Sequence, residues 1–463
     1  MESADARATK NQERNDYADE RVPVAFRTWS TSSIFGVMFG VTTAMIFLSW
    51  GGVLVMQFGT VPLAIGMVIS TLLIGGCAVV FSLRASKTGL GAEMLSRSSG
   101  FGHLGSIPVA LIFALAMIMY FAFEGGIMVN AIHAYFTAIP KWAIILIFAA
   151  LILPLTIYGM KAMNIIMWVT LPVYVVFMIV TVVIALGQGG SGVEFWSFAP
   201  DHVDTTAGPP VLQILAASLG YATQVALSAD TGRLIDPAKA VRGSFLVGGL
   251  SQLLVFMVCT LLGAWLALQF KEADPGIYLP AVMGIWGVLF VVVTQLRINV
   301  VNIYSSSISL TTIGKRISNR APNRSFWVVI AIVVGTIAML TDLYGRITSV
   351  MAFAAIFLLA WVMTVIADLL IVRKILKIVP EDDSPYRKGE LPEFNPVGLT
   401  SVGIAVVVGV PLGLGMAGPF GVTLAPFLSG LLPLLVVPIA AMLTRGRFYR
   451  RSEVNAEKET QRS

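Results

Sequence analysis

Two charged side chains that lie deep inside long apolar stretches are the residues of this sequence best placed to do chemistry. Glu124 and Arg297 each stand near the middle of such a stretch, and they form its one central pair of opposite charge. A charge at membrane depth is costly, so the pair is expected to line a water-accessible site. The alternative is a buried ion pair that only tethers two helices. Asp368, a few residues before Arg373, fits an anchor at the end of a span.

Aromatic and hydroxyl residues accompany both charges at helical spacing. Tyr120 precedes Glu124 by four residues, and Thr294 precedes Arg297 by three, so each pair shares one helix face. Tyr221 lies in a second polar stretch. Two tyrosines, a carboxylate and nearby amide or hydroxyl groups would suit a flat, polar, aromatic solute, although each tyrosine taken alone is also compatible with ordinary packing.

Two apolar stretches are interrupted by glycine and polar residues. The first contains Gly36 and Gly40, followed by hydroxyl residues up to Thr43, and the other reads Gly-Tyr-Ala-Thr-Gln over 220–224. Small residues four apart also favour close helix packing. The two interruptions fall five spans apart, however, as expected for inverted repeats whose broken first helices meet at the bilayer midplane. This spacing predicts a secondary transporter.

The elements that position these residues are membrane helices. Hydrophobic residues make up 57% of the 463 positions, charged residues 12%, and the mean hydropathy is +0.84. Such a composition exceeds what a soluble core can bury, whereas helices of about 20 apolar residues span a bilayer. We predict twelve spans: 32–55, 59–83, 106–132, 142–159, 163–187, 210–228, 243–269, 279–309, 326–342, 347–372, 397–416 and 420–443.

Basic residues give the orientation, because they favour cytoplasmic loops. Of the 31 Lys and Arg residues, only Lys141, Lys271 and Arg346 fall in loops that this arrangement places outside, and only Arg297 falls within the membrane. All the others, Lys161 among them, fall inside. Both termini are therefore expected in the cytoplasm of a multi-pass protein of the plasma (inner) membrane.

Several other classes of protein are disfavoured. Cys77 and Cys259 lie within spans, and the three histidines form no cluster, so we expect neither a metal nor any cofactor. No nucleophile–base set indicates catalytic residues, so an enzyme is not expected. The net charge of +6 follows from the loop bias and does not indicate nucleic-acid binding. The first 30 residues lack the apolar core of a signal peptide.

Several segments together resemble the nucleobase–cation symporter-1 family, the purine–cytosine permeases. The likeness covers nearly the whole membrane domain. The segments that carry it are FGVTTAMIFLSWGGVL (39–54), ASKTGL (85–90), YFAFE (120–124), GYATQVALSADTGR (220–233) and IAD (366–368).

The resemblance implies a fold and a set of domains. The fold is an all-α, twelve-helix membrane protein with a five-plus-five inverted repeat of the leucine-transporter type and two appended helices. The implied divisions are a cytoplasmic tail (1–30), the two five-helix repeats (31–187 and 205–373), a polar cytoplasmic linker (378–395), helices eleven and twelve (396–443) and a second cytoplasmic tail (444–463).

The resemblance also implies a substrate site. Tyr120 and Tyr221 would sandwich a base ring, and Glu124 would stand where relatives use Gln to bind its edge. The site would further contain Gly220, Thr223 and Gln224 from span six and Thr294 from span eight.

The cation site departs from the family pattern. Relatives that use sodium hold it between span-one carbonyls, here near Gly40 and Thr43, and two hydroxyl residues of span eight. Those two positions are here Arg297 and Ile298. A guanidinium cannot coordinate a cation, so we expect sodium-independent transport, with proton coupling through Glu124 or facilitated exchange as the possibilities.

The sequence thus predicts a secondary permease that imports a nucleobase or related heterocycle, such as cytosine or a purine. The expected partners are this small molecule, the lipid bilayer and protons, with no nucleic acid. An amino-acid or organic-cation carrier on the same fold is the alternative, and a channel or receptor is the alternative from another class. The individual base is left open among cytosine, a purine, uracil, allantoin and a hydantoin.

Overall fold

The structure is a computed structural model that describes residues 20–28, 30, 36, 40, 42–157, 160–187, 194–318 and 320–450, with side chains of 160–169 excluded. Every regular element in these ranges is helical, as predicted. Most of the N-terminal tail, the C-terminal tail beyond residue 450, residues 31–35, 37–39 and 41, and the Lys161 side chain lie outside the described residues.

The α-helices differ widely in length. In chain order they are α3 (Met45–Phe58), α4 (Thr60–Thr88), α5 (Ala92–Ser96), α6 (Ile107–Tyr135), α7 (Lys141–Ile157), α8 (Met160–Gly187), α9 (Pro210–Ser218), α10 (Thr223–Gly232), α11 (Ala240–Ser244), α12 (Ser251–Leu253), α13 (Thr260–Phe270), α14 (Pro275–Met283), α15 (Ile285–Ile317), α16 (Arg324–Leu340), α17 (Ile347–Ile366), α18 (Pro396–Gly413) and α19 (Gly418–Thr444).

Short helices of other types join or extend them. The 3₁₀ turns are η1 (Val24–Phe26), η3 (Phe195–Ser197), η4 (Leu219–Ala222), η5 (Pro237–Lys239), η8 (Tyr344–Arg346) and η10 (Arg447–Tyr449). The π-helical stretches are η2 (Arg97–Phe101), η6 (Phe245–Leu250), η7 (Leu254–Cys259) and η9 (Ala367–Ile375).

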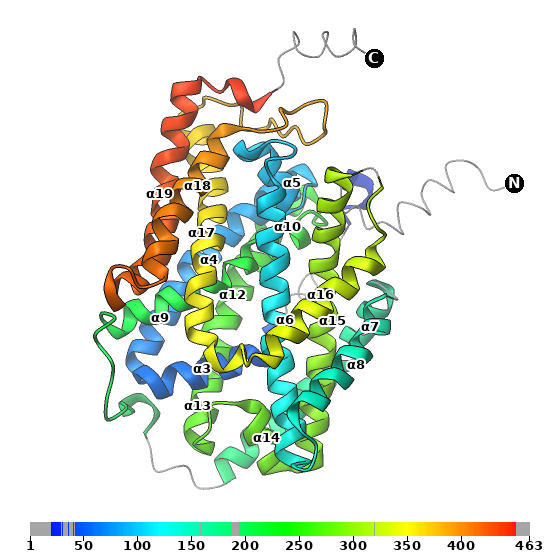
Figure 1. The fold of residues 1–463 in the computed structure, drawn as a ribbon, viewed down its shortest axis with the longest axis vertical. Helices are drawn as coiled ribbons and strands as arrows, with labels where there is room; N and C mark the ends of the chain where they lie inside the picture. The colour runs from blue at the N-terminus through cyan, green and yellow to red at the C-terminus, as the bar shows by residue number, and fades with distance from the viewer. Residues whose placement is uncertain are drawn as a thin grey trace, which may run out of the picture.

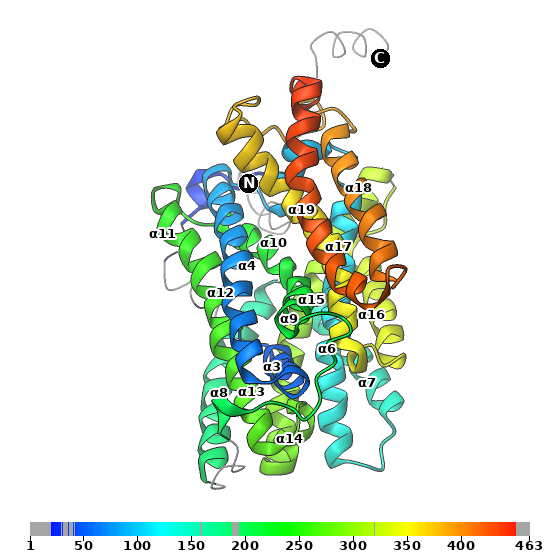
Figure 2. The ribbon, with the colours of Figure 1, turned by 90° about the vertical axis from the view of Figure 1, so that its left-hand side faces the viewer.

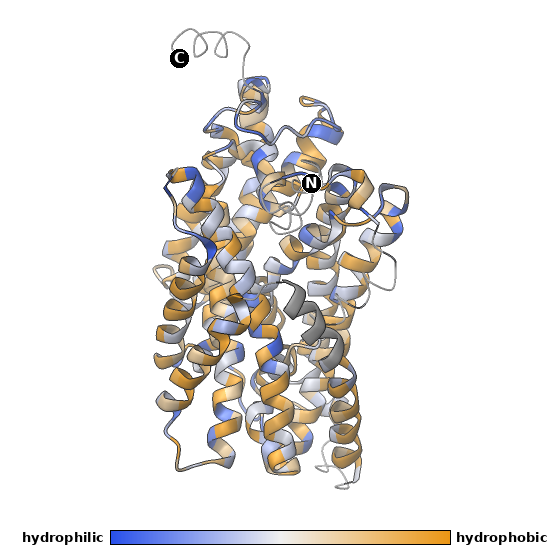
Figure 3. Cartoon of the chain, turned by 90° about the vertical axis from the view of Figure 1, so that its right-hand side faces the viewer, coloured by the Kyte–Doolittle hydropathy of each residue, from blue (hydrophilic) through white to orange (hydrophobic). Residues whose placement is uncertain are grey.

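Nine helical segments of the described chain are long and apolar enough to cross a membrane. The remaining three predicted spans coincide with shorter apolar helices, Met45–Phe58, Lys141–Ile157 and Arg324–Leu340. Large hydrophobic side chains such as Leu72, Val183 and Val407 are exposed on the outside of the bundle. Figure 3 shows hydrophobic residues dominating the helices through the middle of the molecule. A surface of this kind needs lipid as its solvent.

Both predicted interruptions are present. Ala44, just before α3, has an extended backbone with φ −64° and ψ 133°, whereas Gly40 and Thr42 are helical. In the sixth predicted span, the 3₁₀ turn η4 separates α9 from α10. The chain leaves the helical conformation at Ala44, whereas at η4 it stays helical and only tightens to 3₁₀, where the Gly220 carbonyl accepts a hydrogen bond from the Tyr120 hydroxyl.

The prediction for span eight is wrong at its start. Residues 275–283 form the separate helix α14, and α15 begins only at Ile285. Gly284 between them has φ +57°, a conformation that few side chains tolerate, and its backbone turns the chain. Pro280 also lacks the N–H that a continuous helix would use.

The helices pack in two groups with a third layer beside them. The first group pairs α3 with α13 and α4 with α10, and the second packs α6 against α15 and α16. Helices α18 and α19 pack on each other and on α17, at one side of the bundle (Figures 1 and 2). The two broken elements therefore belong to the first group, and they meet the second group in the centre.

Several arginines expected in open cytoplasmic loops are in fact buried. Arg84, Arg97 and Arg373 are each less than a tenth exposed. Arg373 binds Asp368 at 2.7 Å and also donates to the Ser98 carbonyl at 2.6 Å. Asp368 is thus an anchor, as expected, but a wholly buried one. Burial is tolerated because the guanidinium groups donate to backbone carbonyls and carboxylates.

The linker predicted as polar packs against this same end of the bundle. Arg84 donates to the Ser384 hydroxyl at 2.5 Å and to the Asp383 carbonyl at 3.2 Å, and Arg97 donates to the Tyr386 carbonyl at 3.3 Å. Leu391 is buried. The linker is therefore an ordered part of the fold that covers the ends of several helices.

Candidate functional site

A small central pocket lies between the two helix groups, at the level of both breaks. Its volume is about 30 Å³, enough for only one or two water molecules by order of magnitude. It is lined from the first group by Ala44, Ile46, Phe47, Tyr221, Gln224 and Leu227, and from the second by Met117, Tyr120, Glu124, Ile298, Val301 and Asn302. Four of the residues predicted from the sequence, Tyr120, Glu124, Tyr221 and Gln224, thus come together here.

The two tyrosines stack directly on each other. The Tyr120 and Tyr221 ring centroids are 5.8 Å apart and the ring planes differ by 9°. The Tyr120 hydroxyl donates to the Gly220 carbonyl at 2.8 Å and accepts from the Thr223 hydroxyl at 2.9 Å. In this conformation Gly220 and Thr223 therefore hold Tyr120 against the broken helix.

An aromatic cage surrounds the second tyrosine. Phe47, Trp50 and Phe256 place their ring centroids 5.2, 5.6 and 6.0 Å from that of Tyr221. Tyr221 is completely buried, and its hydroxyl has no hydrogen-bond partner among the residues that the structure describes. Such a buried, unpaired hydroxyl is unfavourable unless a ligand or solvent satisfies it.

The Glu124 carboxylate is similarly incomplete. The residue is 1% exposed, and its Oε2 atom has no hydrogen-bond partner. Gln295 of α15 and the Ile46 backbone lie beside the carboxyl group. The Gln295 amide is itself fully buried beside this carboxyl group. A carboxylate and an amide with unused capacity beside a pocket can together bind a solute that carries both donors and acceptors.

Arg297 makes its contacts with the first broken helix instead of with Glu124. Its Nη2 donates to the Thr43 hydroxyl at 2.6 Å and to the Thr43 carbonyl at 3.4 Å, and Thr43 in turn donates to the Gly40 carbonyl at 2.9 Å. The guanidinium also lies 5.8 Å from the centre of the Tyr174 ring. In the described chain no ion pair within 4.0 Å joins Arg297 to Glu124. Glu124 and Arg297 therefore lie near each other but do not form a direct ion pair.

Thr294 is placed differently from the other predicted residues. Its hydroxyl donates to the Phe290 carbonyl of its own helix at 2.8 Å, and it is not among the residues that line the pocket. A contact between Thr294 and a solute stays a prediction. Asn302 of α15 does line the pocket, and sequence inspection missed it, together with Phe47 and Trp50. The polar run Gln295, Asn299 and Asn302 at helical spacing was the available signal.

A second, larger cavity, which we call the vestibule, lies beside the C-terminal half of α3. Its volume is about 310 Å³, and Val53 and Gln57 of α3, the segment Glu272–Asp274 and residues 344–349 line it. Ser49 and Tyr344 hydrogen-bond at 2.6 Å. Along α3, Ser49 lies between Phe47 of the central pocket and Val53 of this vestibule. The Ser49–Tyr344 bond therefore joins α3 to a residue that lines the larger cavity.

Asp274 lines one side of the vestibule. Its carboxylate accepts from the Gly276 backbone at 2.7 Å and from the Asn130 amide at 2.7 Å, and Lys141 donates to the same Asn130 side chain at 2.8 Å. Burial raises the pKa of Asp274 to about 6, against the opposing effect of these donors. The pKa of this carboxyl is therefore higher than that of an ordinary aspartate.

In the described residues, no group of three or more His, Cys, Asp or Glu side chains is close enough to hold a metal ion. The pocket combines aromatic ring faces with one carboxyl oxygen of Glu124 that has no described partner, and the Arg297 guanidinium lies on the same helix as the lining residue Ile298.

Comparisons with known proteins give the chain a family. Residues 21–434 match the family described as permease for cytosine/purines, uracil, thiamine, allantoin. No curated protein sequence matches it significantly. The inward-facing structure of Mhp1 superposes with a TM-score of 0.71 at 16% identity, covering 96% of this chain and 97% of Mhp1. A closed form of Mhp1, titled a nucleobase-cation-symport-1 family transporter with bromovinylhydantoin bound, gives 0.71 at 17% identity, covering 96% and 98%.

More distant proteins share the fold alone. A Na⁺-coupled sialic acid symporter superposes with a TM-score of 0.59 at 13% identity, covering 94% of this chain and 93% of its own. A manganese transporter of Eremococcus coleocola gives 0.56 at 14% identity, covering 92% and 98%.

The architecture is thus the five-plus-five repeat of the leucine-transporter type with two added helices, as the sequence indicated. The count of twelve spans and the boundaries of the two repeats stay predictions. The match over most of the chain also excludes an enzyme. The chain belongs to the family of permeases for cytosine, purines, uracil, thiamine and allantoin, and it is a secondary transporter of nucleobase type in a multi-pass membrane fold.

Proposed function

We propose that this permease imports a nucleobase or related heterocycle across the plasma membrane without coupling to sodium. The observation that carries the proposal is the pair of contacts from Arg297 to the Thr43 hydroxyl and carbonyl. The proposal has two parts, the recognition of the solute and the absence of a cation, and each is supported by different residues.

Recognition of a flat ring is supported by the aromatic lining. Tyr120, Tyr221 and Phe47 supply ring faces, and an aromatic pair adds about 0.5–1.5 kcal/mol beyond area burial. A base held between Tyr120 and Tyr221 needs their rings roughly 7 Å apart, twice an ordinary carbon–carbon contact. The rings are 5.8 Å apart here, so binding must separate them.

The hydrogen bonds of Tyr120 indicate how the Tyr120 and Tyr221 rings would move apart. Tyr120 is held by Gly220 and Thr223 on the broken helix, so a small movement of η4 away from α6 would part the rings and enlarge the pocket. The Gly220 and Thr223 groups freed in this way would then be available to the solute, which is the role expected for them from the sequence. Thr294, one turn before Ile298 on α15, could reach the enlarged pocket.

Recognition of the ring edge is assigned to Glu124, Gln224 and Asn302. The Glu124 Oε2 atom is an unpaired acceptor, and the two amides offer both donors and acceptors. A carboxylate accepts hydrogen bonds from N–H groups but, when ionised, cannot donate them. The site therefore favours solutes with adjacent N–H donors, such as heterocycles with an exocyclic amine.

Sodium independence follows from where Arg297 lies. Transporters of this architecture bind coupling ions at unwound backbone carbonyls. Here the Thr43 carbonyl beside the break already accepts from a guanidinium, which also repels any cation at that point. Arg297 thus acts as a tethered positive charge that is never released. Proton coupling through Glu124 and facilitated exchange are both compatible with it.

The orientation is proposed on the distribution of basic residues. Arg27, Arg84, Arg97, Arg316 and Arg373 all contribute to contacts at one end of the bundle. Lys141 and Arg346 lie at the vestibule end. Because basic residues favour the cytoplasmic side, the vestibule is assigned to the outside and both termini to the cytoplasm.

Uptake of labelled bases tests both parts. Cells that lack their own base transport would express the chain, and cytosine, adenine, uracil, allantoin and a hydantoin would be compared in sodium and choline media at pH 5.5 and 7.5. We expect uptake of an amino-substituted base to be unchanged by sodium and to fall strongly in Glu124→Ala and Tyr221→Ala. Unaltered kinetics in both variants would refute the site, and steep sodium dependence would refute the coupling.

A further inference from the structure

An open apolar groove lies on the outside of the bundle, between α8 and the corner that joins α14 to α15. Its volume is about 280 Å³, and it is lined by Val176, Phe177, Val180, Met283 and Trp286. Pockets for small polar solutes begin near ~300 Å³ and contain several placed polar groups. Here the indole N–H of Trp286 is the one polar side-chain group of the five residues. The lining therefore favours a hydrocarbon chain over a polar solute.

The groove is continuous with the surface that faces lipid. Val176 and Trp286 are each more than half exposed, as is Val183 one turn further along α8. Helix α8 packs on α15 at the edge of the bundle (Figure 1). Counted back from Gly187, the last residue of α8, the groove lies roughly 10–17 Å along the helix axis. This depth falls within the hydrocarbon layer of a bilayer, so lipid chains cover the groove.

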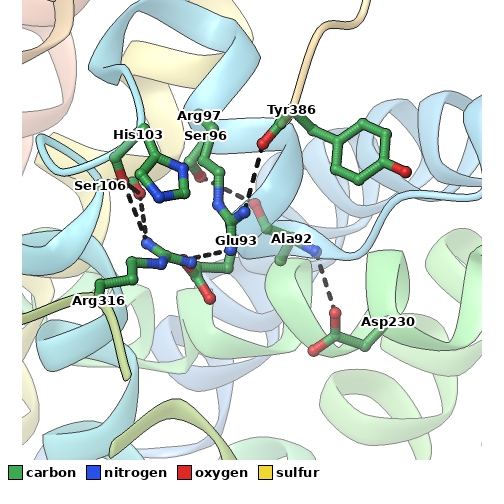
Figure 4. Close-up of polar contacts among 9 residues, drawn as sticks. All are labelled: Ala92, Glu93, Ser96, Arg97, His103, Ser106, Asp230, Arg316 and Tyr386. Carbon is green, nitrogen blue, oxygen red and sulfur yellow. Dashed lines mark hydrogen bonds and ion pairs between the residues drawn. The ribbon is translucent and has the colours of Figure 1, made fainter. Parts of the chain in front are cut away.

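The groove has no group that would select a lipid headgroup. Recognition of a phosphate group needs Arg or Lys donors, and no charged side chain lines the groove in the described part of the chain. At the opposite end of the bundle, by contrast, Arg97 and Arg316 donate to groups of the protein itself (Figure 4). The Thr181 hydroxyl, next to Val180, donates to the Phe177 carbonyl at 2.8 Å. The groove can therefore distinguish lipids only by the shape of their chains.

The inner wall of the groove is connected to Arg297 by packed aromatic rings. The Phe177 ring stacks on Phe290 of α15, with the centroids 5.1 Å apart and the planes at 17°. The Phe290 centroid is 5.6 Å from that of Tyr174 on α8. Tyr174 is buried, and its ring centre lies 5.8 Å from the Arg297 guanidinium. Whatever fills the groove therefore packs against the ring layer beside this buried charge.

We propose that the groove between α8 and the α14–α15 corner binds one acyl chain of a membrane phospholipid, which supports this ring layer. Helices in a bilayer associate mainly through van der Waals packing, because lipid is as apolar as their side chains. An unfilled space beside Phe177 would forfeit such contacts. A chain seated in the groove contacts two helices at once, so it is held more tightly than a chain on the convex surface of one helix.

Native mass spectrometry of the purified full chain tests the site, because it counts the lipids that each molecule retains. The protein is delipidated in detergent and then titrated with a phosphatidylcholine and a phosphatidylglycerol that have identical chains. We expect one phospholipid to bind more tightly than all later ones, with equal affinity for the two headgroups. This outcome does not depend on which solute the permease carries.

Two substitutions should weaken binding of the first lipid by roughly tenfold, which corresponds to about 1.4 kcal/mol. Val180→Phe places a ring in the groove, and Trp286→Ala removes one of its walls. Val183→Phe is the matched control, because it makes the same change on the same exposed helix but outside the groove. Its first lipid should bind as in the parent.

Thermal unfolding gives a second measurement that does not depend on the starting stability of each variant. A ligand that binds the folded state raises Tm. Added phospholipid should therefore raise the Tm of the parent and of Val183→Phe by the same amount, and that of Val180→Phe by less. In the parent, a phospholipid with a diazirine in one chain should label residues 176–180 and 283–286 more than the rest of α8.

Three results would overturn the proposal. Equal first-lipid affinity in the parent, Val180→Phe and Trp286→Ala would mean that the groove exchanges lipid like any other part of the surface. A preference for one headgroup would place the tight lipid at charged residues elsewhere. A dimer of the parent that is lost in Val180→Phe would mean that a second copy of the chain occupies the groove.

Discussion

Arg297 Nη2 lies 2.6 Å from the hydroxyl of Thr43, a residue 254 positions earlier in the chain and directly before the break of the first helix. A permanent positive charge thus occupies the polar backbone that the break exposes. The remaining guanidinium nitrogens, Nε and Nη1, have no hydrogen-bond partner in the described part of the chain, and Tyr174 provides an aromatic face nearby. The energetic importance of this contact leads to the first two predictions.

Removing the charge should create a requirement for sodium. In Arg297→Ser combined with Ile298→Thr, hydroxyl groups would face the Thr43 and Gly40 carbonyls, which is a ligand set for a small cation. We expect parental uptake to be equal in sodium and choline media and uptake by the double variant to be stimulated by sodium. A double variant that transports equally well in both media would contradict this assignment.

Removing the hydroxyl partner should destabilise the protein. Thr43→Val leaves the buried Arg297 guanidinium with one acceptor fewer, at an expected cost of about 1–3 kcal/mol in the free energy of unfolding. Thr71→Val is the matched control, because the Thr71 hydroxyl bonds only to the Met67 carbonyl of its own helix. Thermal unfolding in detergent measures both. Equal losses in the two variants would show that the Arg297 contact has no special weight.

The two stacked tyrosines should respond differently to loss of their hydroxyls. Tyr120→Phe breaks two hydrogen bonds, to Gly220 and from Thr223, and should lower stability by about 1 kcal/mol or more. Tyr221→Phe removes a buried hydroxyl that has no partner, so stability should be unchanged or higher. The same Tyr221 variant should bind the solute more weakly if that hydroxyl contacts it, which a raised half-saturating concentration would report. A larger loss of stability for Tyr221→Phe than for Tyr120→Phe would reverse the assignment.

Asp274 should give stability a measurable dependence on pH. Its pKa is raised from 3.8 to about 6 by burial, so the folded state takes up this proton at a higher pH than the unfolded chain. Ionisation therefore disfavours folding, and the contribution is a loss of stability as pH rises from about 4 to about 6, on the order of 3 kcal/mol in total.

The test of this titration is a comparison of thermal unfolding across pH. The difference in Tm between the parent and Asp274→Asn should change between pH 4 and 6.5 and be constant above that range, because Asn does not titrate. Asp204→Asn, at an exposed turn, provides a control. A parent and variant whose Tm values run parallel over the whole range would show that Asp274 has an ordinary pKa.

Much of the fold followed from local properties of the sequence. Runs of apolar residues located the membrane helices because hydropathy acts over one helix length, and glycine followed by hydroxyl residues located both breaks. Span eight was wrongly extended because Pro280 and Gly284 lie within an unbroken apolar run, and hydropathy does not detect a change of direction. The ordered packing of the linker was missed for a related reason, because many of its contacts join buried arginines to main-chain carbonyls, which every residue carries.

The candidate site was predicted in part. Tyr120, Glu124, Tyr221 and Gln224 were identified from residue type and spacing, and they do line one pocket. Phe47 and Trp50 were missed because an aromatic residue in an apolar helix carries no signal that distinguishes packing from binding. Asn302 was recognisable only as one member of a polar face on a long helix.

By itself, the sequence determined the type of protein, the position of the breaks and the presence of one positive charge within the membrane. These are properties of single segments, set by composition and by periodicity. Only the tertiary structure decided that Arg297 reaches Thr43, that Tyr120 stacks on Tyr221, and that the start of α5 meets Asp230. Each of these is a contact between segments far apart in the chain. Such contacts depend on how helices pack against one another, and no local pattern of residues encodes that packing.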